Sequence, residues 1–124
     1  MICVYKIKKH VLESLLEASR NTYPNEFFAL LGGDREKKVI DEFIITPAVY
    51  GKRHALYWPH LAPIDSKVMG SVHSHPSRSG TPSGADVRGF ARSGEIHLII
   101  FYPFGAKDFR AFNALGEEAE IKTT

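Results

Sequence analysis

The spacing of hydrophobic and polar positions changes several times in the first part of the chain. Residues 2–7, ICVYKI, are rich in β-branched and aromatic side chains and predict a short strand. From Lys8 to Thr22 the apolar side chains fall on one face of a helix. Residues 26–33, EFFALLGG, and 39–46, VIDEFIIT, have the length and composition of strands. A polar turn separates these two segments, which predicts a hairpin.

The second part of the chain starts irregularly and then returns to regular elements. Residues 47–63 contain three prolines and predict a long connection, with a short strand over 54–57 and a short helix over 61–67. The remaining predicted elements are a strand over 68–73, a helix over 83–92 ended by Gly94, and strands over 96–102, 108–113 and 118–123. This order predicts an α/β fold in which helices flank a mixed β-sheet.

Composition indicates an ordinary globular protein. The length of 124 residues predicts a single domain over 1–124, and 44% hydrophobic with 24% charged residues is typical of a folded chain. No apolar run approaches the roughly 20 residues that span a bilayer, and the first residues lack a secretory pattern. The single cysteine, Cys3, cannot form an internal disulfide. We therefore expect a cytoplasmic location and no membrane partner.

The charge pattern says little about partners. The net charge is +2, and the lysines and arginines are spread along the chain apart from a short cluster at Lys6, Lys8 and Lys9. A nucleic-acid-binding domain usually gathers its basic residues on one face. Nucleic acid is therefore not an expected partner, and the sequence leaves the oligomeric state open.

The stretch from His73 to Asp86, HSHPSRSGTPSGAD, carries the candidate chemistry. Alternate side chains of a strand share a face, so His73 and His75 can bind one ion together. Residues 76–85 let the chain turn back and begin a helix, whose first turn presents Asp86 as a third ligand. Two imidazoles and one carboxylate suit zinc, and three protein ligands leave a fourth position for water. We predict one Zn²⁺ per chain at this site.

Hydrolysis at such a site also needs a base. Zinc lowers the pKa of bound water from about 15.7 to around 7, and a glutamate outside the ligand set can take its proton and pass it to the leaving amine. Glu13 and Glu17 lie at solvent-facing helix positions, and Glu36, Glu117 and Glu118 lie in turns. Glu26 differs because it opens an apolar segment just after Pro24, where burial can hold it in place. Glu26 is the candidate general acid/base.

Ser83 has two interpretations. It precedes Asp86 by three residues, where a serine can cap the helix. Its hydroxyl could instead donate to the oxyanion of a tetrahedral intermediate, a role worth a few kcal/mol in enzymes that use it. Both roles draw on one side chain, although Thr81 is a second candidate cap. The spacing alone leaves both interpretations open.

The histidines also have simpler interpretations. The HSH segment could be an ordinary polar strand end. The presence of Asp86 at ligand spacing makes this interpretation less favoured. The other four histidines have no such partners in sequence and are expected to be surface or packed side chains: His10, His54, His60 and His97.

These residues together form a pattern: an early glutamate, then H-x-H-P, then seven residues after His75, then S-x-x-D. The pattern resembles the JAMM motif of MPN-plus metalloproteases, most closely the small single-domain archaeal type, and the similarity extends over the chain, including PNEFFALLGG around Glu26. The resemblance implies a three-layer, cytidine-deaminase-like fold (the JAB1/MPN domain) and zinc held by His73, His75 and Asp86. It also implies Glu26 as general acid/base and Ser83 as oxyanion partner, which passes the cap to Thr81.

The resemblance further implies a substrate class. Members of the family cleave isopeptide bonds after the C-terminal glycine of ubiquitin or ubiquitin-like proteins, and some archaeal members remove small sulfur-carrier-like modifiers from lysine. The chain departs from many relatives at Ala29, where they carry glycine, and it lacks room for the insertions that position ubiquitin chains. Linkage selectivity is therefore not expected. Residues Val49 to Trp58 are predicted to form one wall of a groove for an extended substrate tail.

The motif also has other interpretations. A zinc deaminase needs H-x-E and P-C-x-x-C, which a chain with only Cys3 lacks, and HExxH is also absent. A RadC-like protein of DNA metabolism carries a similar H-x-H and aspartate, but no helix-hairpin-helix segment is visible. A peptidase that frees sulfur-carrier proteins from a C-terminal amino acid fits the motif equally well. A non-catalytic MPN scaffold or a closed structural zinc is less favoured because every ligand is present.

Overall fold

The computed structural model describes residues 4–45 and 68–124. Its elements are β1 (Val4–Ile7), α1 (Lys9–Thr22), β2 (Phe28–Asp34), β3 (Val39–Ile44), β4 (Val68–His75), α2 (Gly84–Ser93), β5 (Ile96–Phe101), β6 (Phe109–Phe112) and β7 (Glu118–Thr123). The predictions that lie outside these residues are those for the strand over 54–57, the helix over 61–67, the groove wall from Val49 to Trp58, and the histidines His54 and His60.

The described strands form one mixed sheet in the order β1-β3-β2-β4-β5-β6-β7. β2 and β3 form the predicted hairpin, and β2 also runs antiparallel to β4. β4 and β5 are parallel neighbours joined through α2, which is a β-α-β crossover. β1 then pairs in parallel with both β3 and β7, so the sheet closes into a barrel.

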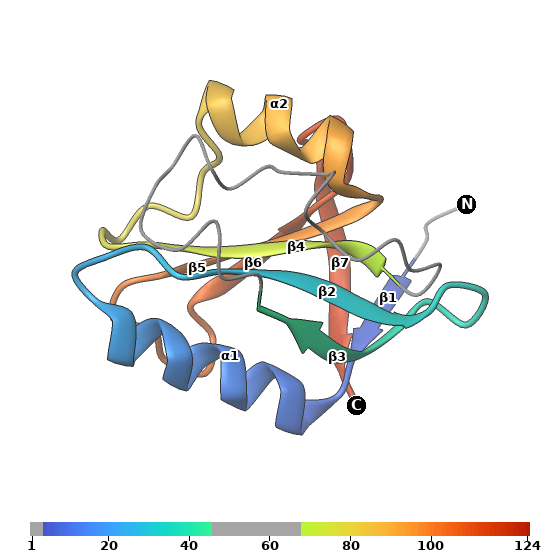
Figure 1. Ribbon diagram of the computed structural model, residues 1–124, viewed down its shortest axis with the longest axis horizontal. Helices are drawn as coiled ribbons and strands as arrows, with labels where there is room; N and C mark the ends of the chain where they lie inside the picture. Colours follow the sequence, from blue (N-terminus) through green and yellow to red (C-terminus); the bar gives the residue numbers. More distant parts are fainter. Residues whose placement is uncertain (1–3, 46–67) are drawn as a thin grey trace.

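The two helices lie on opposite sides of the sheet (Figure 1). α1 packs the apolar face that its spacing predicts, and Leu15 is fully buried there. α2 covers the other side of the sheet with Phe90, which forms a second cluster with Ile99 and Phe112. The α/β class and the mixed sheet flanked by helices are confirmed. Ala91, the next residue of α2, is exposed, because one short helix buries only a narrow face.

Two of the strand ends that differ from their predicted positions lie at the candidate site. The strand predicted to end at His73 continues through His75 because β5 pairs with it along this whole length, up to the pair His75–Phe101. Pro76 then follows, and proline lacks the N–H that a further ladder bond needs. The strand predicted to begin at Glu26 begins at Phe28 instead.

Gly94 ends α2 as predicted and turns the chain into β5. Its φ of 127° lies in a region that favours glycine, and a Cβ there would come within 2.3 Å of the Met69 carbonyl oxygen. The close approach fixes how α2 sits above β4. Neither helix of the described residues, 4–45 and 68–124, is long and apolar enough to cross a membrane.

Candidate metal centre

The two histidines of the site come from the end of a central strand. β4 lies between β2 and β5: His73 pairs with residues on both neighbours, and His75 pairs with Phe101 of β5. The side chains of His73 and His75 are 4% and 15% exposed. A rigid, mostly buried strand end therefore presents two imidazoles from one face.

The N-terminus of α2 presents the carboxylate. Ser83 is the N-cap, and its Oγ accepts a hydrogen bond of 3.0 Å from the Asp86 N–H. Asp86 Oδ2 in turn accepts a hydrogen bond of 2.9 Å from the Ser83 N–H, which completes a capping box. The assignment of the cap to Thr81 is therefore wrong, because only Ser83 has the acidic partner three residues later.

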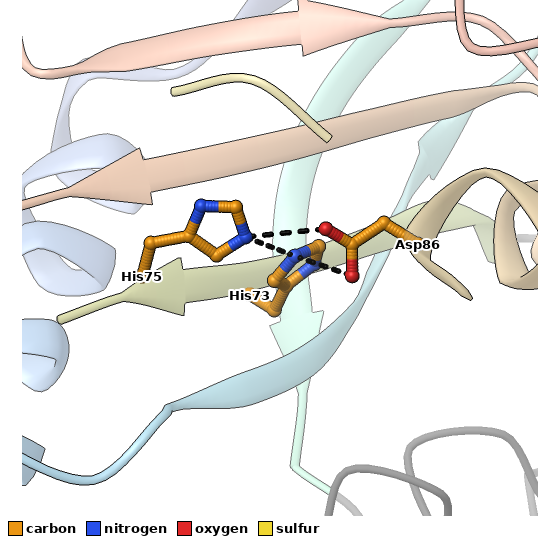
Figure 2. A group of neighbouring side chains, drawn as sticks. All are labelled: His73, His75 and Asp86. Carbon is orange, nitrogen blue, oxygen red and sulfur yellow. Dashed lines mark hydrogen bonds and ion pairs between the residues drawn. The ribbon is translucent and has the colours of Figure 1, made fainter. Parts of the chain in front are cut away.

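The three predicted ligands converge (Figure 2). The Nε2 atoms of His73 and His75 lie 3.2 Å apart. His75 Nε2 lies 3.2 Å from Asp86 Oδ2, and His73 Nε2 lies 3.3 Å from Asp86 Oδ1. Among residues 4–45 and 68–124, this is the one group of three or more histidine, cysteine or acidic side chains whose ligand atoms lie within 4.8 Å of one another.

The donor set and its spacing fit zinc. A tetrahedral zinc ion with bonds of about 2.0–2.1 Å separates its ligand atoms by roughly 3.3 Å. The separations of 3.2 and 3.3 Å in this site match that value. Three protein ligands would leave a coordination position for water, which distinguishes a catalytic from a closed structural site. His73, His75 and Asp86 thus form a candidate His-His-Asp metal site.

The surroundings prepare the ligands for a metal. Burial raises the pKa of Asp86, but hydrogen bonds from His73 and His75 outweigh it and hold that pKa far below its usual range. Burial lowers the pKa of His75, whereas hydrogen bonds with Asp86 and the Ser79 carbonyl raise it, and the net result is a raised pKa. Asp86 is therefore ionised at neutral pH, while protons compete with a metal for His75.

The Ser79 carbonyl orients one imidazole. It lies 2.8 Å from His75 Nδ1. A carbonyl can only accept, so Nδ1 carries a proton, and when the imidazole is neutral its Nε2 has the lone pair that a metal needs. The loop after His75 therefore selects the ligating tautomer.

A buried histidine lies behind the site. The ring of His97 stacks on Phe90 at a centroid distance of 4.4 Å, and Phe90 lies 6.3 Å from the His73 ring. His97 Nε2 donates to the Gly94 carbonyl at 3.0 Å, so Nδ1 accepts from the Ser71 hydroxyl at 2.7 Å. His97 is fully buried, as expected for a packed histidine, and His10 is exposed on α1. His54 and His60 lie outside the described residues.

His97 gives an expected pH dependence of stability. Burial lowers its pKa to about 4, so above pH 6.5 it is neutral in both the folded and unfolded states. Below pH 6.5 the unfolded state binds the proton first, and stability falls until the pH reaches about 4. The free energy of unfolding should drop by roughly 3 kcal/mol over this window through His97 alone. Denaturant titrations of wild type and His97→Gln with chelator present, at pH 7 and pH 4, measure it. Equal losses in both proteins would contradict the expectation.

The general-base candidate lies beside the ligands. Phe28 pairs with His73, and the antiparallel register continues with Phe27 opposite Ser74, where the Ser74 N–H donates to the Phe27 carbonyl at 2.9 Å. Continued by one more pair, this register would bring Glu26 opposite His75. Facing residues of antiparallel strands point to the same side, and the charge of Glu26 contributes to the raised pKa of His75. Glu26 is half-buried.

The Ser83 hydroxyl can cap the helix and still act as a donor. In the cap, Ser83 Oγ accepts a hydrogen bond through one of its lone pairs. The hydroxyl proton is still available to donate a hydrogen bond. The cap and an oxyanion contact therefore do not compete, contrary to the expectation from sequence. The oxyanion role itself stays a prediction.

Two contributors to the site were not found from the sequence. Ser79 acts through its backbone carbonyl, for which a sequence gives no signal. Ser74 lies between the two histidines, and its side chain bonds the Phe27 N–H across the sheet at 2.8 Å. Its placement on a buried face was visible from alternation, but its partner, 47 residues away, was not.

The comparisons with known proteins agree with this geometry. A family model for prokaryotic homologs of the JAB domain matches residues 8–114. A protein of Haloferax volcanii named "Probable metalloprotease" is 36% identical over 127 residues, which cover 95% of this chain and 78% of that protein.

Solved structures share the fold over nearly the whole chain. A JAB1/MPN domain protein from Archaeoglobus fulgidus is 39% identical with a TM-score of 0.78, covering 96% of this chain and 98% of its own. A structure described as "JAMM: A Metalloprotease-like Zinc Site in the Proteasome and Signalosome" is 35% identical with a TM-score of 0.78, covering 98% and 99%. With the His-His-Asp site in place, the chain belongs to the JAB/JAMM (MPN) metalloprotease family.

Proposed function

We propose that this JAMM metalloprotease is a zinc-dependent isopeptidase. Its substrate would be the bond between the C-terminal glycine of a ubiquitin-like modifier or sulfur-carrier protein and a lysine or peptide amine. The observation that carries the proposal is the convergence of His73, His75 and Asp86 at zinc spacing, with the charge of Glu26 close enough to act on His75. The solved JAMM relative described as having a metalloprotease-like zinc site supports zinc as the metal.

The chain's own residues then have defined roles. His73, His75 and Asp86 would hold zinc, which when bound supplies Lewis acidity that makes water nucleophilic near neutral pH. Glu26 takes the proton from the attacking water and delivers it to the leaving amine, so the bond breaks without releasing a strongly basic anion. The Ser83 hydroxyl donates to the oxygen that becomes negative when the carbonyl carbon turns tetrahedral.

The substrate class rests on the family resemblance. The family motif occurs here with all five functional positions, which disfavours a non-catalytic MPN scaffold. A peptidase that releases sulfur carriers from a C-terminal amino acid would use the same residues. A RadC-like role in DNA metabolism is less favoured, because the basic residues are spread along the sequence. We place the reaction in the cytoplasm, in agreement with the single cysteine.

The first test is metal dependence. The purified protein should contain about one zinc per chain and cleave at least one member of a panel of ubiquitin-like fusions and lysine conjugates. A chelator should abolish cleavage, because Asp86 and the two histidines then hold no Lewis acid, and added zinc should restore it. Metal analysis and gel-based cleavage assays with and without chelator give both readouts.

A matched pair of variants controls the test. His75→Ala should lose zinc and activity together, whereas His10→Ala, on the exposed side of α1, should keep both within about twofold, since surface changes have small effects. A metal-free preparation with full activity would refute the mechanism. A linear fusion cut faster than a lysine conjugate would instead favour the sulfur-carrier peptidase.

A further inference from the structure

Ser74 is a buried polar residue for which the mechanism has no role. It is 1% exposed and lies between the two histidine ligands of β4. Because side chains alternate along a strand, its hydroxyl points to the face opposite the metal site. Its Oγ accepts a hydrogen bond of 2.8 Å from the Phe27 N–H. The Ser74 N–H also donates to the Phe27 carbonyl at 2.9 Å. Ser74 therefore binds both the backbone N–H and the backbone carbonyl of Phe27.

The Phe27 N–H belongs to the peptide group that joins Glu26 to Phe27. A hydrogen bond to this N–H fixes the plane of that peptide and with it the backbone direction of Glu26. β2 begins only at Phe28, so Glu26 precedes the first residue of the strand. Segments just outside a strand have fewer ladder bonds and gain order from specific contacts. The Ser74 hydroxyl supplies one such contact at this position.

The position of Glu26 matters for catalysis. Continued beyond Phe28 and Phe27, the register would bring Glu26 opposite His75, and the charge of Glu26 acts on the His75 imidazole. A general base must lie within hydrogen-bond reach of the proton that it takes. A displacement of about 1 Å can cost roughly 100-fold in rate. We propose that Ser74 is a positioning residue: by binding the Phe27 backbone from the face opposite the metal, it holds Glu26 over the ligand strand. This inference rests on the proposed function of Glu26.

Kinetics of Ser74→Ala test the proposal. The variant should keep about one zinc per chain, because its side chain points away from the metal, and should lose roughly ten- to a hundredfold in kcat with little change in KM. Ser74→Thr, which retains the hydroxyl, should recover most of the rate. The matched control is Ser71→Ala, a buried serine of the same strand that bonds His97 instead. An equal loss of kcat in Ser71→Ala, or none in Ser74→Ala, would overturn the proposal.

A double-mutant cycle separates positioning from a general structural effect. If Ser74 acts through Glu26, adding Ser74→Ala to Glu26→Gln should slow the residual reaction by less than about twofold, measured in single turnovers with excess enzyme. Independent effects would multiply. Multiplicative losses would therefore assign Ser74 a role unrelated to Glu26.

Hydrogen exchange gives a readout that needs no substrate. The Phe27 amide should exchange slowly in the wild-type protein and at least tenfold faster in Ser74→Ala, while the Leu31 amide in the middle of β2 stays unchanged. Unchanged exchange at Phe27 would overturn the proposal. The wild-type protein could cleave nothing in the panel while Phe27 exchange still responds to Ser74→Ala. That result would refute the proposed function but support the contact between Ser74 and the Phe27 backbone.

Discussion

Glu26→Gln is expected to retain zinc and to lose hydrolysis by roughly 10²- to 10⁴-fold, the contribution typical of a positioned general base. Glutamine keeps the size and hydrogen-bonding capacity of the side chain but cannot accept the proton of the attacking water at neutral pH. The loss should appear in kcat, because Glu26 acts on the transition state more than on substrate binding. Metal analysis and steady-state kinetics on one conjugate measure both effects.

A second glutamate supplies the control for this variant. Glu13→Gln on the exposed side of α1 removes the same charge away from the site and should leave kcat within about twofold. If Glu26→Gln lost its zinc, Glu26 would be a fourth ligand, and a site closed by four protein ligands would be structural. Full activity with zinc bound would exclude Glu26 as the base.

Local patterns account for the parts of the fold that the sequence predicted. The α1 face, the β2–β3 hairpin and the two histidines on one face depend on residues close in the chain, where the helical and strand periods fix the direction of each side chain. Closure of the sheet depends on the pairing of β1 with β7. Val4 of β1 pairs with Glu120 of β7, and these residues lie near opposite ends of the chain. No local period encodes such a pairing.

In the candidate site, too, some features follow from local spacing and others depend on contacts between distant segments. The spacing from His75 to Asp86 predicted that a helix N-terminus would bring the carboxylate back, and the structure brings these ligand atoms together. Glu26 was expected inside a strand, but it precedes β2, and its position depends on the register of β2 against β4 and on the Ser74 hydroxyl. That register is set across 47 residues. Composition alone could not supply it.

The helix cap shows where a local signal was misread. Thr81 beside Pro82 resembles a cap followed by the proline that often opens a helix. The deciding signal is Asp86, three residues after Ser83, because only this pair can exchange two hydrogen bonds in a capping box. Asp86 Oδ2 thus contacts both the Ser83 N–H and His75 Nε2. The cap therefore orients a predicted metal ligand as well as starting α2.

Two substitutions at Ser83 can separate its cap from its predicted oxyanion contact. Alanine at an N-cap costs about 1 kcal/mol of stability, whereas glycine costs only a few tenths. Both remove the hydroxyl, and both keep the backbone N–H that binds Asp86 Oδ2. If the hydroxyl donates to the oxyanion, both variants should lose roughly 10²- to 10³-fold in kcat despite their different stabilities. Denaturant titrations and kinetics of the zinc-loaded proteins measure the two effects.

The hydroxyl-retaining variant completes the series. Ser83→Thr keeps both the acceptor for the Asp86 N–H and a donor for the substrate, so it should retain most of the activity. If Ser83→Gly were nearly as active as wild type while Ser83→Ala was slow, activity would follow the cap. Ser83 would then act only by holding Asp86 against the two histidines, and the stabilisation of the oxyanion would have to come from the metal.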